Sequence, residues 1–200
     1  GICSIDILPV KRIFQGELRT SHIVTTAGRV GGPATMLRSE DDGASWKVID
    51  LSEHAGMILD VKFHDPKTGF VCASGVSATG EGDAVMLMTR DGGKSWKPVW
   101  RSKRKLENVW KMSWPSRKVG YATVQSYDEA ARNRRVVIKT VDGGKSWKEI
   151  LLVDEAGILD AATRQYLEKL SADLEAKSTD QLVVVTLKSL QGTSIEDYGY

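Results

Sequence analysis

Short apolar runs separated by polar turns occupy most of the first 150 residues of the chain. The segment from Asp60 to Gly75 reads as an apolar strand, a polar turn with a proline, and a second strand that opens on Gly-Phe. The segment from Trp110 to Gln125 repeats this order, and its second strand opens on Gly-Tyr 51 residues later. Apolar runs bounded by turn residues are typical of β-strands. The pattern therefore predicts antiparallel strands in a repeating unit.

Two complete units and one earlier unit follow from this pattern. The complete units contain strands expected near 57–64, 69–75, 84–90 and 95–100, and near 107–114, 119–126, 134–140 and 146–151. The earlier unit contains strands expected at 22–28, 34–39 and 45–50, with residues 5–14 as its first strand. A four-stranded unit of this length is the size of one β-propeller blade. We therefore predict mainly β structure, a partial propeller of about three four-stranded antiparallel blades.

The last fifty residues break the period and show a helical pattern instead. Asp160 is the expected N-cap of the helix. One stripe of the helix is apolar and consists of Ala162, Tyr166, Leu167, Leu170 and Leu174. The helix precedes an apolar strand at Gln181–Leu187, and this order is typical of α/β construction. We expect two incomplete domains, propeller blades over residues 1–150 and a short α/β segment over residues 151–200.

One octapeptide recurs at residues 39–46, 89–96 and 140–147, each time as Ser/Thr-x-Asp-x-Gly-x-Ser-Trp. The acid is suited to accept backbone N–H groups in a tight turn, and the glycine allows the positive φ that such a turn needs. The tryptophan begins the outgoing strand and is expected to bury one face between sheets. The residues of this structural turn are Ser39, Asp41, Gly43, Trp46, Thr89, Asp91, Gly93, Trp96, Thr140, Asp142, Gly144 and Trp147.

The octapeptide resembles the Asp-box, or BNR repeat, of sialidases, sortilin-type receptors, xyloglucanases and photosystem II assembly and stability factors. In those families the box is a structural hairpin turn on the outside of a propeller. Because Gly-aromatic strands repeat in phase with the boxes, residues 1–150 look most like the photosystem II assembly-factor type. The resemblance implies a non-catalytic segment with a protein-binding or assembly role and a protein partner.

The last fifty residues resemble the start of a TPM domain. The resemblance rests on Val153–Leu159, on the strand Gln181–Thr186 and on Ser194–Tyr198. TPM domains are extracytoplasmic, often membrane-tethered, and in some members act as phosphatases. The resemblance implies an extracytoplasmic, membrane-proximal setting. Such domains run well beyond a hundred residues, so we expect the chain to be a piece of a longer protein or a chimera.

Charge is divided unevenly along the chain. Residues 1–150 carry a net charge of +7, and residues 151–200 carry −5. The basic residues that we expect on loops between strands, as candidate partner-binding residues, are Arg101, Lys103, Arg104, Lys105, Arg117, Lys118, Arg132, Arg134 and Arg135. A solvated surface is the alternative for these residues, and the acidic 151–200 segment is an alternative, intramolecular partner. Nucleic acid is not an expected partner, because no recognised binding fold accompanies a whole-chain charge of only +2.

The sequence predicts no catalytic residues, no cofactor and no metal site. The two cysteines, Cys3 and Cys72, lie too far apart for a zinc motif, and Cys72 is expected to be a small core residue. Asp60 and Asp83 read as turn residues. Two alternatives stay open: a sialidase-like or xyloglucanase-like glycoside hydrolase fragment, and a truncated TPM-type phosphatase or repair-associated domain. An incomplete arc of blades also exposes sheet edges, which favours self-association.

Overall fold

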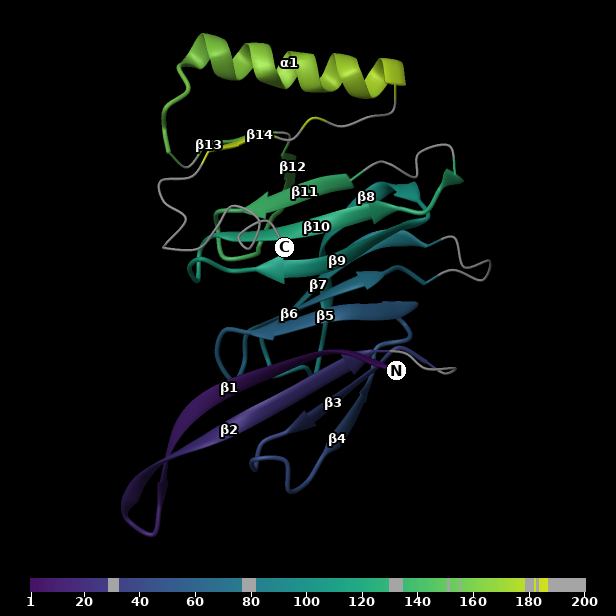
Figure 1. The fold of residues 1–200 in the computed structure, drawn as a ribbon. Helices are drawn as coiled ribbons and strands as arrows, with labels where there is room; N and C mark the ends of the chain where they lie inside the picture. Colours follow the sequence, from purple (N-terminus) through teal and green to yellow (C-terminus); the bar gives the residue numbers. More distant parts are fainter. Residues whose placement is uncertain are drawn as a thin grey trace. The chain divides into compact units, whose positions relative to one another are not determined.

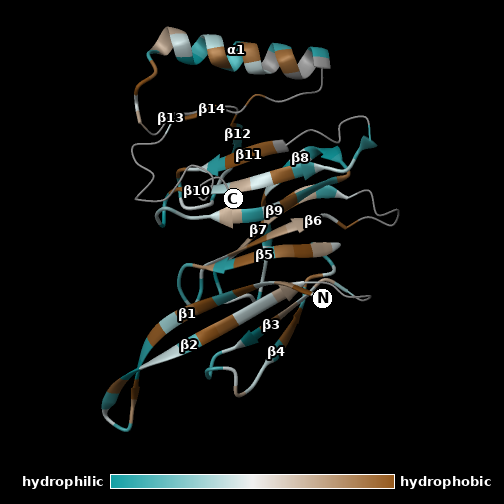
Figure 2. Ribbon diagram, viewed as in Figure 1, coloured by the Kyte–Doolittle hydropathy of each residue, from teal (hydrophilic) through white to brown (hydrophobic). Residues whose placement is uncertain are grey.

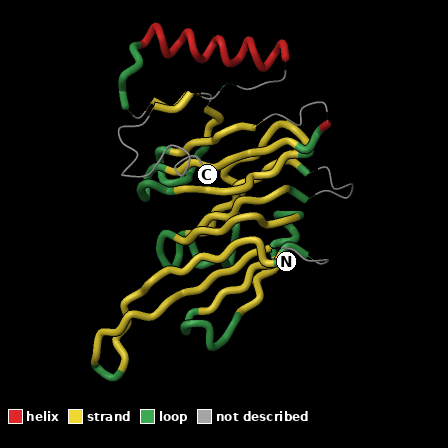
Figure 3. Tube along the Cα trace, viewed as in Figure 1, coloured by secondary structure: helices red, strands yellow, loops and turns green. Residues whose placement is uncertain are grey.

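The computed structural model describes residues 1–28, 33–76, 82–129, 135–150, 152–154, 156–178, 182 and 184–186. The chain divides into two compact units, Gly1–Lys148 and Glu149–Tyr200, which we call the propeller unit and the C-terminal unit. Strands dominate the propeller unit, and the described part of the C-terminal unit contains one α-helix (Figure 3).

Three four-stranded antiparallel sheets follow one another along the propeller unit (Figure 1). The first blade is the sheet β1 (Ile2–Phe14), β2 (Glu17–Gly28), β3 (Thr35–Ser39) and β4 (Lys47–Asp50). The second blade is β5 (Met57–Phe63), β6 (Gly69–Ser74), β7 (Asp83–Thr89) and β8 (Lys97–Lys105). The third blade is β9 (Glu107–Ser113), β10 (Gly120–Ser126), β11 (Arg135–Thr140) and β12 (Lys148–Ile150). The predicted fold class, a partial propeller with a short C-terminal α/β segment, is confirmed.

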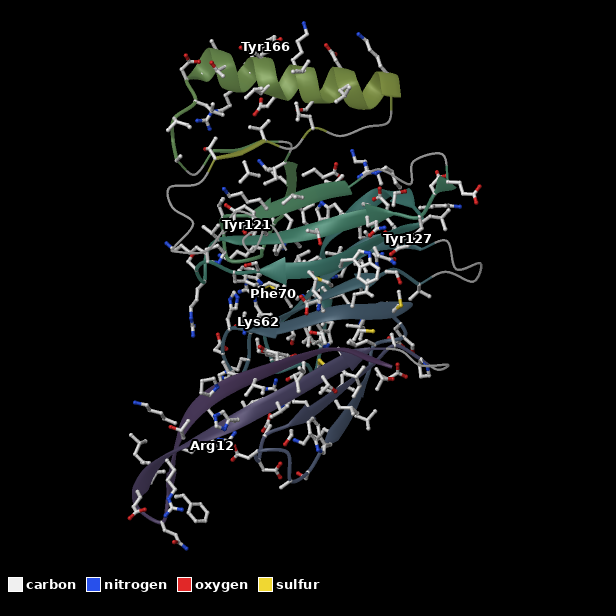
Figure 4. The ribbon with its side chains drawn as sticks, in the orientation of Figure 1. Arg12, Lys62, Phe70, Tyr121, Tyr127 and Tyr166 are labelled. Carbon is white, nitrogen blue, oxygen red and sulfur yellow. The ribbon has the colours of Figure 1, made fainter. Side chains whose placement is uncertain are left out.

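The second blade is buried on both faces because it packs between the other two blades. Successive side chains of a strand point to opposite faces, so β6 sends Val71 and Ala73 into the core shared with the first blade. The same strand sends Cys72 and Phe70 into the core shared with the third blade; Phe70 is labelled in Figure 4. This two-sided burial explains why the two central strands, β6 and β7, are almost continuously hydrophobic, whereas the edge strand β8 is mostly polar and exposed (Figure 2). Cys72 is a buried, free core residue as predicted.

The hairpin of β1 and β2 is longer than the apolar pattern predicted. Its pairing continues to Phe14 and Glu17, whereas β3 pairs with β2 only from Val24 onward. The turn residues Gln15 and Gly16 have φ values of +51° and +82°, and positive φ at both central residues matches the right-handed twist of a two-residue hairpin. The expected first strand already ended at Phe14, so the part that was missed is mainly residues 17–21 at the start of β2. Residues 17–20 are exposed on both faces and show no hydrophobic alternation. The hairpin extends beyond β3 and β4 (Figure 1).

Buried acids connect the first strands of neighbouring blades. Asp6 of β1 accepts hydrogen bonds from the Phe63 backbone N–H and from Lys62 Nζ of β5, both at 2.7 Å. Asp60 of β5 accepts the Met112 N–H of β9 at 3.0 Å. The prediction that Asp60 is a turn residue was therefore wrong, because its carboxylate satisfies a donor on the next blade. Asp83 was also misassigned, since it begins β7.

The C-terminal unit contains β13 (Leu152–Asp154), α1 (Ala161–Ser178) and β14 (Val184–Thr186), and β13 pairs with β14 in parallel. Asp160 caps the helix as predicted, because its Oδ1 accepts the Thr163 N–H at 2.7 Å. The predicted apolar stripe is not a buried one: Tyr166 is 65% exposed and Leu170 is 40% exposed. The stripe stays exposed because the two described strands, which pair over three residues each, are too short to cover a helix of 18 residues. No helix in the described ranges has the length and apolar character needed to cross a bilayer.

Candidate functional site

Each Asp-box closes the turn between the third and fourth strands of a blade. In the second blade, Asp91 Oδ1 accepts hydrogen bonds from the Ser95 backbone N–H at 2.9 Å and from the Thr89 hydroxyl at 2.8 Å. Asp91 Oδ2 accepts the Ser95 hydroxyl at 2.6 Å. The Thr89 oxygen in turn accepts the Gly93 N–H at 2.9 Å. Both carboxylate oxygens are thus used to hold the turn.

The other two boxes repeat this geometry. Asp41 accepts the Ser45 N–H at 2.8 Å and the Ser45 hydroxyl at 2.6 Å. Asp142 accepts the Ser146 N–H at 3.1 Å and the Ser146 hydroxyl at 2.7 Å. The motif therefore builds one turn three times, as its local chemistry predicted.

The first box contains an acid that the sequence analysis did not identify. Asp42 stands where the other boxes have Gly92 and Gly143, and it adopts a φ of +58°. Its Oδ1 lies 2.8 Å from both the backbone nitrogen and the ring Nδ1 of His22. The hydrogen bond from the His22 side chain lowers the pKa of Asp42. The only signal in the sequence was an acid at a position where the other copies have glycine.

The turn hydrogen bonds keep the box carboxylates ionised. The Ser45 hydroxyl is the main cause that lowers the pKa of Asp41 to about 2. The Ser146 hydroxyl does the same for Asp142, whose pKa is also about 2. Ser95 lowers the pKa of Asp91 in the same way. These acids are acceptors at neutral pH and have no proton to donate in catalysis.

We expect the propeller unit to lose stability as the pH falls through the acid range. The pKa of Asp142 falls from 3.8 to about 2 on folding, so its stabilising effect is complete above 3.8 and is lost as the pH falls toward 2. Thermal midpoints measured from pH 7 to pH 2 test this. Asp142→Asn should melt lower at pH 7 and depend less on pH below about 4. A variant with the same pH profile as the wild type would contradict this role.

Only two of the three box tryptophans are buried as predicted. Trp96 is 6% exposed and Trp147 is 5% exposed, whereas Trp46 is 44% exposed. Each buried ring lies in the core shared with the preceding blade. Trp46 belongs to neither of the two cores that the described residues form.

The basic candidate residues occupy strands as well as turns. Those on β8 are Arg101, Lys103, Arg104 and Lys105. Their predicted place in a loop was wrong, because β8 continues across bulges to pair Lys105 with Asp83. The turn between β9 and β10 contains Arg117 and Lys118, as predicted, and β11 begins at Arg135. Arg132 and Arg134 lie outside the described residues.

Several of these cations already have structural partners. Arg101 Nη1 lies 3.0 Å from Asp83 Oδ1, and Arg104 Nε lies 2.6 Å from Glu107 Oε1, a carboxylate that is 1% exposed. Lys103 is exposed on the same strand and forms no ion pair with any described residue. Arg104 is therefore bound to the fold, and Lys103 is the freer charge of this group.

The remaining ionisable groups do not gather into a metal or catalytic cluster. Within the described ranges, no group of three or more His, Cys, Asp or Glu side chains is placed to hold a metal ion. His64 packs edge-on against Trp114, with ring centres 4.2 Å apart, and its burial lowers its pKa. Its role in the described structure is packing between the second and third blades.

Stacked four-stranded sheets with Asp-box turns define a β-propeller of the Asp-box class. The profile of the photosynthesis system II assembly factor YCF48 family matches residues 44–158, more than half of the chain. The chain belongs to this family. A TPM domain profile matches residues 152–200. The two matches confirm the predicted combination of assembly-factor blades and a TPM-like segment.

Comparison with individual proteins adds two solved structures. No curated protein matches the chain. The structure of YCF48 bound to a D1 peptide is similar at 20% identity and a TM-score of 0.43, over 65% of this chain and 36% of that one. A GH43_1 enzyme from Xanthomonas citri is similar at 10% identity and a TM-score of 0.37, over 74% of this chain and 56% of that one. The chain thus spans 36% of the length of the solved YCF48 chain.

Proposed function

We propose that the chain is a non-catalytic, protein-binding propeller segment that serves the assembly of a larger complex. Membership of the YCF48 assembly-factor family, over residues 44–158, is the observation that carries this proposal. The box geometry supports it, since the three repeated acids are engaged in turn hydrogen bonds. An inverting glycosidase, the alternative, needs two free carboxyl groups roughly 6.5 to 9.5 Å apart across a substrate.

A hydrolysis assay separates the two functions. The protein is incubated with sialosides and with β-glucans, and released sugar is measured against time. We expect no turnover above the uncatalysed background. Turnover that is abolished by substituting a single carboxylate would contradict the binding function. If that carboxylate belongs to an Asp-box, a thermal melt of the variant checks that the loss of turnover is not caused by unfolding.

The basic residues of the second and third blades are the partner surface that we propose. Lys103 is the residue to test, because its charge is exposed and its removal breaks no ion pair with a described residue. A D1 peptide, the ligand in the solved YCF48 structure, is the first probe. We expect Lys103→Glu to slow association at low salt and to matter less at high salt, where a Debye length of about 8 Å or less screens surface charge.

The control for this test is Lys47→Glu, which reverses an exposed charge on β4 of the first blade. Both variants should keep the melting temperature of the wild type, because neither side chain is buried. Association that is indifferent to salt and to Lys103→Glu would assign these basic residues to an ordinary solvated surface.

A further inference from the structure

A cavity of about 330 Å³ lies where β7 and β8 of the second blade meet the box turn of the third blade. Its lining consists of Met88, Arg90, Ser95, Lys97, Val99 and Lys145. These residues come from β7, from β8 and from the Asp-box turns of the second and third blades, and all belong to the propeller unit. The box carboxylates are not among the described residues of its lining, although Ser95, which is, donates its hydroxyl to Asp91.

The cavity combines unpaired positive charge with an apolar floor. Arg90, Lys97 and Lys145 are exposed cations, and none forms an ion pair with a described residue. No acid is among the described residues that line the cavity. Met88, which is 7% exposed, and Val99 belong to the core between the second and third blades or pack against it. A ligand that fits this lining needs negative charge next to an aliphatic group.

The corresponding place between the first two blades is neutralised. Glu40 follows Ser39 of the first box as Arg90 follows Thr89 of the second, and Arg38 stands where the second blade has Met88. Arg38 Nε lies 3.3 Å from Glu40 Oε1. Arg38 is also 2% exposed and donates to the Pro66 carbonyl at 2.8 Å. The junction between the first and second blades thus contains an internal ion pair. The junction between the second and third blades contains cations that pair with no described acid, next to apolar side chains.

We propose that this cavity binds an acidic peptide segment in which an aliphatic side chain lies between carboxylates. Arginine and lysine pair with carboxylates through charge-assisted hydrogen bonds, and Met88 and Val99 receive the aliphatic group. None of the described lining residues is aromatic, so they offer a nucleobase no stacking surface. The cavity uses the first residues of β8, Lys97 and Val99, and does not include the candidate residues Arg101 to Lys105 of the same strand. It does not depend on the proposed assembly function.

The probe is a fluorescein-labelled, C-terminally amidated peptide with the core Glu-Leu-Glu, titrated with the whole protein and followed by fluorescence polarisation. We expect Arg90→Glu to weaken binding by about tenfold or more, because a carboxylate that repels the acidic peptide replaces a guanidinium that attracts it. Arg90→Lys should retain most of the affinity, since it keeps the charge. Lys47→Glu is the control, because it reverses an exposed charge outside the cavity, at the position of the first blade that corresponds to Lys97.

Further probes decide whether both parts of the cavity are used. Peptides with the cores Gln-Leu-Gln and Glu-Ser-Glu should each bind at least about tenfold more weakly than Glu-Leu-Glu. Free glutarate should not compete at equal concentration, since it lacks the aliphatic branch. The proposal is overturned if Glu-Leu-Glu does not bind, if Arg90→Glu and Lys47→Glu bind it equally, or if Glu-Ser-Glu or glutarate binds as well. Weakening by Lys103→Glu alone would place the peptide on the β8 surface instead.

Discussion

Trp96→Ala is expected to lower the free energy of unfolding of the propeller unit by about 3 to 5 kcal/mol, the usual cost of removing a buried tryptophan. The Trp96 ring is 6% exposed and meets the Phe63 ring edge-on, with ring centres 6.3 Å apart. It lies in the core between the first and second blades. Its loss opens a cavity at a junction between blades, where the surrounding strands cannot collapse far without breaking their pairing.

Trp46→Ala is the matched control, because the same motif position is 44% exposed in the first blade. Its effect should be less than half as large, since the ring is already in contact with solvent. Urea denaturation followed by circular dichroism measures both variants. Equal losses of stability at the two positions would show that the box tryptophans do not derive their effect from packing between blades.

Gly144→Ala is expected to cost about 2 to 5 kcal/mol, from two independent causes. Gly144 has a φ of +80°, and an added Cβ would collide with the Phe70 ring and lie 3.1 Å from the Trp114 ring. The left-handed backbone costs an L-residue about 1 to 2 kcal/mol, and overpacking a core costs about 1 to 3 kcal/mol. Phe70 is fully buried, so it has no open space into which it can move.

Gly43→Ala separates the two causes. Gly43 has a φ of +91°, but its added Cβ would meet only the Trp46 ring, at an ordinary 3.7 Å. The expected cost is therefore the backbone term alone, about 1 to 2 kcal/mol. Thermal or urea melts of the two variants should differ by the overpacking term. If they lose the same stability, the close approach of Gly144 to Phe70 does not matter.

The regular parts of the fold could be predicted because each depends on a few neighbouring residues. The box turn needs a hydroxyl, an acid and a glycine within five consecutive positions, as in Thr89–Gly93, and the structure joins these atoms as the motif predicts. The Asp160 cap is equally local, because its acceptor reaches a donor three residues away. Strand alternation likewise located the blades, since burial on one or both faces leaves a period in the sequence.

The candidate site was less predictable because the pairing of its charges depends on how the strands are arranged in space. Arg101 and Arg104 read as free cations in the sequence, but the pairing of β7 with β8 brings Asp83 to Arg101, and Glu107 of β9 accepts from Arg104. Asp60 read as a turn residue, but it satisfies a backbone donor 52 residues away. A single sequence does not show which of two like charges will meet an acid.

The sequence by itself determined the repeat, the box turns, the fold class and the family to which the chain belongs. Only the tertiary structure decided which box tryptophans are buried, which cations are paired, and that Arg90, Lys97 and Lys145 line one cavity. The physical reason is one of range. A turn or cap is set by hydrogen bonds over three to five residues. Burial depends instead on blades that stack residues about 50 positions apart, and ion pairing depends on which strands lie side by side, as β7 and β8 bring Asp83 to Arg101.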